Sequence, residues 1–237
     1  DCADDANFRG GWRENTSKVW RSQELVDWIE AAQPGILLNN RSGLPGDFRT
    51  PEQSVPSGSE GGVFEACVTM THHHWGFCPG DPYKDLSTVL SELVSCAAAG
   101  GNYLLNVGPD PDGAIPQPAY ERLLAIGQWM ERHGEAIYGS EHHLPNWWDY
   151  FSTGRITTRG SCAYLIIQTW SPNGTIALGQ LQNEVLRATL LGNGQELSVR
   201  RRGRQLIVDG LPPTPPAAPF NVIKLELNGP AAPQYFY

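Results

Sequence analysis

Residues 85–113 constrain the fold more than any other part of the sequence. Apolar side chains recur there at helical spacing, at Leu86, Val89, Leu90, Leu93 and Val94. One face of the predicted helix is therefore apolar and must pack against another element. Gly100 and Gly101 then end the helix. Residues 103–107 are apolar on both alternating faces, which is typical of a buried parallel strand. The turn formers at 108–113 take the chain out of the sheet at the strand's carboxyl end, where α/β barrels carry their chemistry.

The residues on either side of this stretch extend the α/β pattern. A helix is predicted over 22–32, with Ser22 as its cap and a buried side made of Leu25, Val26, Trp28 and Ile29. Residues 36–39 predict a short buried strand, followed by a long loop over 40–62 and a strand over 63–69. After a second loop over 72–83 and the central stretch, Pro118 opens a helix that reaches His133 and stops at Gly134. This order predicts a parallel sheet with three evident strands.

The period of the pattern changes beyond residue 150. Short β-prone segments alternate with turns such as Pro172-Asn173-Gly174, at 163–170, 175–178, 185–191, 197–200, 206–208 and 222–227. This spacing predicts an antiparallel β-sandwich. The fold class is therefore α/β followed by all-β, with domains over residues 1–141 and 142–237.

Composition excludes several classes of function. The 237 residues are 40% hydrophobic and 18% charged, as in globular domains, and carry a net charge of −8, which argues against nucleic acid as a partner. No apolar run approaches the roughly 18 residues of a membrane span. The five cysteines have no metal-binding spacing. They are interpreted as buried free thiols, with Cys67–Cys78 as the one pair that could form a disulfide.

Several motifs resemble one known family. The run GGNYLLNVGPDPDGAIP, with HHWGF and YKDLSTVLSELVSCAAA before it and LLAIGQWMERHGEAIYGSE after it, is similar to the last barrel strand and final helices of the family 29 glycoside hydrolases, the α-L-fucosidases. QPGILLNNR, GDFRTPEQ and FEACVTM extend the resemblance upstream, over residues 1–141. It implies a (β/α)8-like barrel of which only the later strands are present, followed by the β-sandwich.

The resemblance also implies a pair of catalytic carboxyl groups. Retaining glycosidases need a nucleophile and an acid/base about 5–5.5 Å apart, and composition alone does not choose among the carboxylates of the barrel region. The start of the chain, DCA, resembles the family's nucleophile motif with Cys2 in place of glycine, which points to Asp1, with Asp4 and Asp5 as the fallback. TPEQ resembles the acid/base motif and points to Glu52, whose pKa burial under sugar would raise. Glu65, on a predicted strand, is the rival or a substrate ligand.

Two further residues match family positions that contact the sugar. Arg41, after ILLNN, corresponds to an arginine that approaches the sugar and the nucleophile, and a structural salt bridge is the alternative. Trp75 corresponds to an aromatic side chain that packs against fucose, and a place in the core is the alternative. The residues His72-His73-His74 do not predict a metal site, because neighbours on an extended chain point to opposite faces and no further ligand lies at suitable spacing.

The leading hypothesis is a retaining exo-glycosidase that hydrolyses terminal α-L-fucosyl linkages through a covalent fucosyl-enzyme, without a cofactor. The alternative is a catalytically incomplete fucose-binding or scaffold fragment, since the first barrel half is absent from this sequence. Expected partners are a fucosylated glycan or glycoside, and either the amino-terminal barrel half or a second copy in a homo-oligomer. The resemblance implies a secreted, periplasmic or lysosomal-type location.

Overall fold

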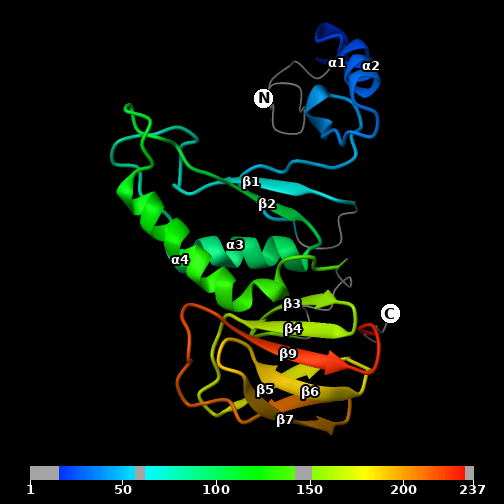
Figure 1. Cartoon of the computed structure of the whole chain (residues 1–237), viewed down its shortest axis with the longest axis vertical. Helices are drawn as coiled ribbons and strands as arrows, with labels where there is room; N and C mark the ends of the chain where they lie inside the picture. The colour runs from blue at the N-terminus through cyan, green and yellow to red at the C-terminus, as the bar shows by residue number, and fades with distance from the viewer. Residues whose placement is uncertain (1–15, 57–61, 142–150, 233–237) are drawn as a thin grey trace.

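The computed structural model describes residues 16–56, 62–141 and 151–232. Three layers follow one another in Figure 1: a short parallel sheet, a pair of helices, and a curled antiparallel sheet. The elements of the first two layers are α1 (Thr16–Val19), α2 (Ser22–Ala32), the 3-10 turn η1 (Asn40–Ser42), β1 (Glu65–Thr69), α3 (Leu86–Ala98), β2 (Asn102–Asn106), α4 (Gln117–His133) and the 3-10 turn η2 (Gly134–Ala136).

Helix α3 is the central layer and packs on both sides. Asp85 caps it, because its side chain accepts a hydrogen bond from the Thr88 amide at 2.7 Å. The predicted apolar stripe faces the antiparallel sheet, where Leu90 and Val94 are fully buried. The opposite face carries the small residues Cys96 and Ala99, which pack against β1. The helix therefore covers the parallel strands with its small side chains and the antiparallel sheet with its large ones.

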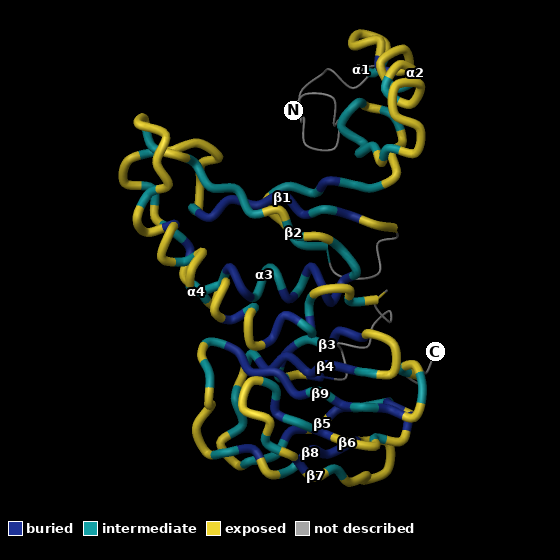
Figure 2. Tube along the Cα trace, in the orientation of Figure 1, coloured by how far each residue is buried: buried dark blue, intermediate teal, exposed yellow. Residues whose placement is uncertain are grey.

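Strands β1 and β2 run parallel, as the pattern predicted, with Cys67 opposite Leu104 in the register. The expectation that the second strand is buried on both faces is wrong. Its outer face lies toward α3, where Tyr103 donates a hydrogen bond to Glu92. Its inner face carries Leu104, which is 42% exposed because no described element covers that side of the sheet (Figure 2).

The predicted long loop over 40–62 contains a strand-like segment at 49–53 that runs parallel beside β1. Backbone hydrogen bonds join Arg49 N to Val63 O at 3.0 Å, Glu65 N to Arg49 O at 2.9 Å and Cys67 N to Pro51 O at 2.9 Å. Residues 36–39, in contrast, do not form the predicted strand. Asn39 makes one isolated parallel bridge, with Phe48. The segment that pairs with β1 on the side away from β2 is therefore 49–53 and not 36–39.

Helix α2 has the predicted bounds but not the predicted burial or cap. Arg21 occupies the cap position but its side chain makes no capping hydrogen bond, and the Ser22 hydroxyl donates instead to Ser42 O at 2.6 Å. Leu25 is 50% exposed and Trp28 is 70% exposed. Val26 and Ile29 are partly buried, so the apolar side of this helix, at the edge of the molecule seen in Figure 1, is covered only in part.

Helix α4 joins the helical layer to the antiparallel sheet. It has Pro118 in its first turn and ends at Gly134, as predicted. Trp129 is 4% exposed, and its Nε1 donates to Phe220 O at 3.0 Å across this interface. With Leu90 and Val94, these residues form one core with Tyr164 and other side chains of the antiparallel sheet.

The carboxyl-terminal strands form one seven-stranded sheet in the order β3-β4-β9-β6-β7-β8-β5. Their bounds are β3 (Gly154–Arg159), β4 (Cys162–Ile167), β5 (Thr175–Gly179), β6 (Val185–Leu190), β7 (Gln195–Arg202), β8 (Gln205–Asp209) and β9 (Asn221–Leu227). The predicted antiparallel pairing is confirmed, and the sheet curls around a single apolar core instead of dividing into two separate sheets. Strand β3 was not predicted.

Candidate active site

Arg41 is held in place by a short turn and two polar neighbours. It lies in η1, where its backbone amide donates to the Asn39 side chain at 3.1 Å. Its Nε donates to Thr50 Oγ1 at 3.0 Å, and that hydroxyl donates to Asn40 Oδ1 at 3.2 Å. Thr50 is only 3% exposed, so the guanidinium is anchored from the inside. Asn40 lies within the motif QPGILLNNR and Thr50 within TPEQ, but the sequence analysis assigned a role to neither residue.

The structure brings together two of the predicted site residues, because the Arg41 guanidinium and the Glu52 carboxylate form an ion pair. Their side chains are 22% and 29% exposed, so bulk water screens the pair only in part. Burial alone would lower the pKa of Arg41, but the hydrogen bond and the charge of Glu52 raise it above its ordinary value. Glu52 is therefore a partly buried residue and not an exposed loop residue.

Cys67 and Glu65 lie on the same face of the sheet as this pair. Glu52 bridges to Cys67 in parallel register, and side chains two residues apart on a strand share a face, which places Glu65 beside them. Cys67 is buried, and burial raises the pKa of its thiol although the nearby Arg41 opposes the shift. Cys67 and Cys78 are both free thiols, so the suggested disulfide is not formed. The inner face thus carries a guanidinium, two carboxyl groups and a protonated thiol.

Trp75 lies in the loop between β1 and α3, at the carboxyl edge of the parallel strands, and is 39% exposed. It is therefore not a core residue. The loop packs on the end of β2 so closely that a Cβ on Gly108 would lie 2.5 Å from the backbone nitrogen of Phe77. Trp75 thus lies at the end of the strands where α/β barrels carry their chemistry, and its role in binding sugar stays a prediction.

The histidine run beside Trp75 is organised by one carboxylate. His73 Nδ1 lies 2.7 Å from Asp81 Oδ1, and the His74 amide donates to Asp81 Oδ2 at 3.1 Å. Burial alone would raise the pKa of Asp81, but these hydrogen bonds lower it to about 2. Among residues 16–56, 62–141 and 151–232, no group of three or more His, Cys, Asp or Glu side chains could hold a metal ion.

Asp1, the predicted nucleophile, and its fallbacks Asp4 and Asp5 lie outside the described residues. Within the described part of the chain, no helix is long and apolar enough to cross a membrane.

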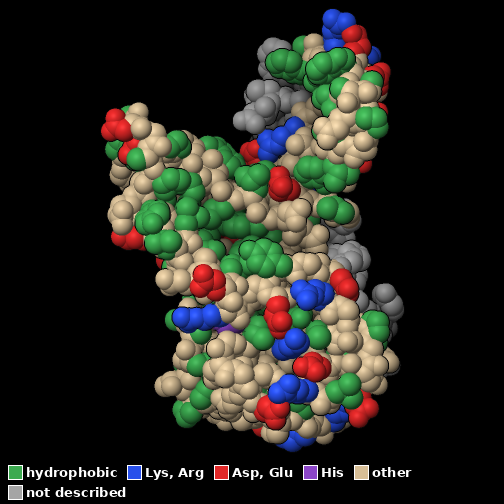
Figure 3. Space-filling model, viewed as in Figure 1, with side chains coloured by type: hydrophobic (Ala, Val, Ile, Leu, Met, Phe, Trp, Pro, Cys, Tyr) green, Lys and Arg blue, Asp and Glu red, His purple; other side chains and the backbone are tan. Residues whose placement is uncertain are grey.

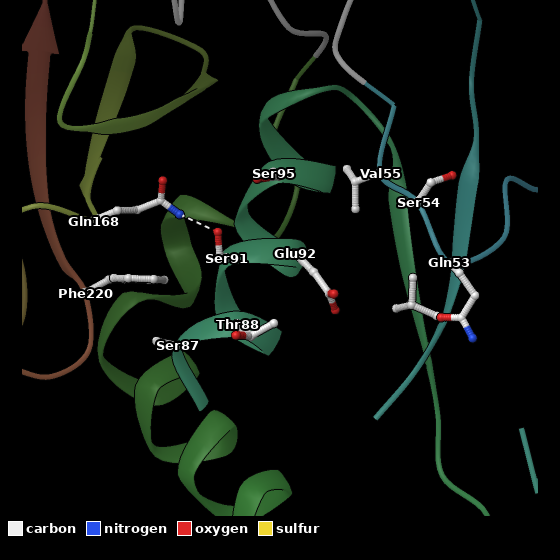
Figure 4. A pocket seen from close by; sticks show the side chains of 11 residues that line it. Gln53, Ser54, Val55, Ser87, Thr88, Ser91, Glu92, Ser95, Gln168 and Phe220 are labelled. Atoms are coloured by element: carbon white, nitrogen blue, oxygen red, sulfur yellow. Dashed lines mark hydrogen bonds between the residues drawn. The ribbon is translucent and has the colours of Figure 1, made fainter. Parts of the chain in front are cut away.

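A cavity of about 640 Å³ opens on the other side of β1, between this strand and α3 (Figure 4). Val68 lines it, and Val68 alternates with Cys67 along the strand, so the cavity lies on the face opposite the Arg41–Glu52 pair. Its helical wall is polar, with Ser91 accepting a hydrogen bond from Gln168 at 2.9 Å. Gln53 reaches its rim from the strand-like segment.

Parallel strands with a carboxylate and an arginine near their carboxyl edge, packed through helices on an antiparallel sheet, define an α/β glycosidase-like architecture. The family model described as alpha-L-fucosidase matches residues 4–135. The chain belongs to the α-L-fucosidase family of glycoside hydrolases.

Individual relatives agree with this assignment. Human tissue alpha-L-fucosidase is 30% identical over 222 residues, which cover 88% of this chain and 47% of that protein. The solved structure of alpha-L-fucosidase isoenzyme 1 from Paenibacillus thiaminolyticus is 33% identical, with a TM-score of 0.82 over 92% of this chain and 56% of that one. A Bacteroides thetaiotaomicron alpha-L-fucosidase, trapped as a covalent intermediate with 2-fluoro-fucosyl fluoride, has the same fold, with a TM-score of 0.78 at 22% identity. The chain spans about half the length of these relatives.

Proposed function

We propose that this chain supplies the later barrel strands and the antiparallel sheet of a retaining α-L-fucosidase, which hydrolyses terminal α-L-fucosyl linkages through a covalent fucosyl-enzyme. The observation that carries the proposal is the Arg41–Glu52 ion pair on the inner face beside β1, formed by two residues that the family motifs had singled out. The covalent intermediate of the Bacteroides relative supports the retaining route. The division into domains over 1–141 and 142–237 and a secreted, periplasmic or lysosomal-type location belong to the same proposal.

The proposed roles follow from the chemistry of the side chains. Glu52 donates a proton to the leaving glycosidic oxygen while Asp1 attacks the anomeric carbon, and Glu52 then removes a proton from the water that releases fucose. In the structure the Glu52 carboxyl group is bound to the Arg41 guanidinium. Glu52 must therefore exchange its bond to Arg41 for one to the substrate before the first step, while Arg41 turns toward the sugar oxygens and Asp1. Trp75 packs against the sugar at the carboxyl edge, and Glu65 binds substrate or replaces Glu52 as the acid.

Replacement of Glu52 by glycine tests the assignment. We expect Glu52→Gly to slow the release of poor leaving groups far more than that of activated ones, because only poor leaving groups need protonation. Azide should restore turnover of an activated fucoside by attacking the fucosyl-enzyme without a base. If Glu52→Gly retains activity on natural fucosides within a few-fold of the unmodified protein, the acid/base role passes to Glu65.

The second candidate is a fucose-binding or scaffold fragment that lacks activity until an amino-terminal barrel half covers it. It is favoured by the uncovered inner face, where Leu104 is 42% exposed, and by the uncovered side of α2, where Trp28 is 70% exposed. Figure 3 shows hydrophobic side chains around the hollow between these regions. Proteins rarely leave such surface open to water.

Expression of residues 1–237 alone, and together with the upstream half, distinguishes the two candidates. Under the fragment hypothesis the short chain binds little fucose and does not cleave a fluorogenic fucoside, and addition of the upstream half restores both. Robust turnover by a monomer of the short chain would contradict the need for a partner. A second copy in a homo-oligomer is the remaining partner, and it would appear as a doubled mass in solution.

A further inference from the structure

Gln53, the residue after Glu52, has an unusual backbone conformation. Its φ is +51°, in the left-handed region that side chains other than glycine rarely adopt. Its amide nitrogen still belongs to the parallel ladder and donates to Cys67 O at 2.9 Å. The chain leaves the ladder immediately afterwards. A strained residue that adjoins a proposed catalytic group and persists must be held by its surroundings.

The Gln53 side chain continues the ladder where the backbone leaves it. Regular parallel pairing, already made by Glu65 N to Arg49 O and by Cys67 N to Pro51 O, would next join the Thr69 amide to the carbonyl of Gln53. Instead the Thr69 amide donates to the side-chain Oε1 of Gln53 at 3.3 Å. Thr69 is fully buried, so without this acceptor its amide would lose a partner in a place that water does not reach.

A second bond closes the contact into a clamp. The Thr69 hydroxyl has one proton, which it donates to Thr71 O at 2.6 Å. The hydroxyl oxygen is then free to accept from Gln53 Nε2, at 3.0 Å. The side-chain amide thus presents its oxygen and its nitrogen to one buried residue. We call this arrangement the Gln53–Thr69 clamp.

We propose that Gln53 is a positioning residue of the fucosidase reaction, which fixes the Glu52 carboxyl group for proton transfer through the Gln53–Thr69 clamp. The proposal rests on the proposed function of Glu52. The clamp ends the strand one residue after Glu52, so the Glu52 backbone cannot rotate away from the ladder. Gln53 also lines the cavity behind β1 (Figure 4), while its side-chain amide bonds to Thr69, which shares the face of Glu65 and Cys67 on the strand.

Three variants of the complete protein test the clamp, with two aryl fucosides that differ in the acidity of their leaving phenols. Gln53→Gly keeps the left-handed conformation at no steric cost but removes both side-chain bonds. Thr69→Val removes the hydroxyl at nearly constant shape, and Thr69→Ser restores it. Gln180→Gly is the matched control, because Gln180 also has a positive φ, of 61°, and directly follows β5 of the antiparallel sheet, away from the pair.

We expect Gln53→Gly and Thr69→Val to lower kcat for the poor leaving group about 10–100-fold, the cost of a misplaced catalytic group. With the activated leaving group, kcat/KM should change less than about threefold, because this quantity reports formation of the fucosyl-enzyme, and the activated phenol leaves without the acid. Thr69→Ser should recover most of the lost rate. Gln180→Gly should leave the ratio between the two substrates unchanged.

An equal fall on both substrates, or no fall, would overturn the positioning role, since a loss of folded protein scales both rates alike. Hydrogen–deuterium exchange at the Thr69 amide gives a readout that does not need activity. Gln53→Gly should accelerate this exchange, and unchanged protection would show that the clamp does not exist. If the unmodified protein cleaves neither fucoside, the proposed function fails. If exchange at the Thr69 amide is nevertheless faster in Gln53→Gly, the clamp exists, but Gln53 is then a structural residue only.

Discussion

The polar cluster between α3 and β2 allows a loss of stability to be worked out from the structure. Lys84 Nζ lies 2.8 Å from Glu92 Oε1, and the Tyr103 hydroxyl donates to Glu92 Oε2 at 2.8 Å. The Lys84 and Glu92 side chains are 10% and 22% exposed. Burial, with the added effect of the Glu92 carboxylate, raises the pKa of Tyr103, so its hydroxyl stays protonated as the donor. One carboxylate therefore joins the loop before α3, the helix itself and strand β2.

Glu92→Gln keeps the shape and an acceptor for Tyr103 but leaves the Lys84 ammonium without its counter-charge. Removal of one partner of a buried pair costs about 3–5 kcal/mol, and the residual exposure of these side chains reduces our expectation to about 2–3 kcal/mol. The matched control is Glu196→Gln, whose partner Arg187 lies with it on the surface, 69% and 52% exposed. That variant should lose less than about 1 kcal/mol.

Urea unfolding followed by circular dichroism measures the change, and hydrogen exchange of peptides from α3 and β2 localises it. Adding Lys84→Met to Glu92→Gln should recover part of the loss, since no unpaired ammonium then remains. The reasoning is refuted if Glu92→Gln costs no more than Glu196→Gln, because water would then solvate Lys84 as well as it solvates Arg187.

Three further predictions concern packing, pH and metal dependence. Trp129→Ala should destabilise the protein by about 3–5 kcal/mol in urea unfolding, because a buried indole and its hydrogen bond across the interface are lost, and a small effect would mean that α4 does not anchor the sheet. Burial lowers the pKa of His133 below 6.5, so the stability due to its neutral form is complete above that pH and is lost as the pH falls toward the lowered value. The difference in unfolding free energy between the unmodified protein and His133→Gln should therefore shrink between pH 8 and 5. A difference that stays constant over this range would contradict the reasoning. Dialysis against EDTA should leave fucosidase activity unchanged, because no ligand set accompanies the histidines at 72–74. If elemental analysis found stoichiometric zinc that is lost together with the activity, the protein would have a metal site that we did not predict.

Local pattern was sufficient to predict α2, α3, α4 and most strands, but not the short helix α1. The spacing of Leu86, Val89 and Leu90 predicted α3, and Pro118 with Gly134 predicted the bounds of α4. These signals lie within a few residues of one another, so they do not depend on what the chain packs against. Burial is different. The apolar side of α2 and Leu104 of β2 were expected to be covered, but coverage depends on packing between segments that are far apart in the sequence, which local pattern does not contain.

The antiparallel part was predicted for the same local reason, apart from β3. Its residues, GRITTR, alternate polar and apolar side chains only weakly, so the period carried little signal. Pairing with β4 places it in the sheet, with Ile156 opposite Leu165. Such a strand can be identified only from the strand with which it pairs, and the local sequence does not contain this pairing information.

The strand-like segment at 49–53 shows why the site was predicted only in part. Pro51 has no amide hydrogen, and a proline usually argues against a strand, so the segment was assigned to a loop. The ladder tolerates it because the Pro51 carbonyl still accepts from Cys67 N at 2.9 Å. That single placement sets Glu52 opposite Cys67 and beside Arg41, which lies on a separate turn. The motif could name Glu52 and Arg41, but their meeting depends on a parallel register between segments that local propensity does not connect.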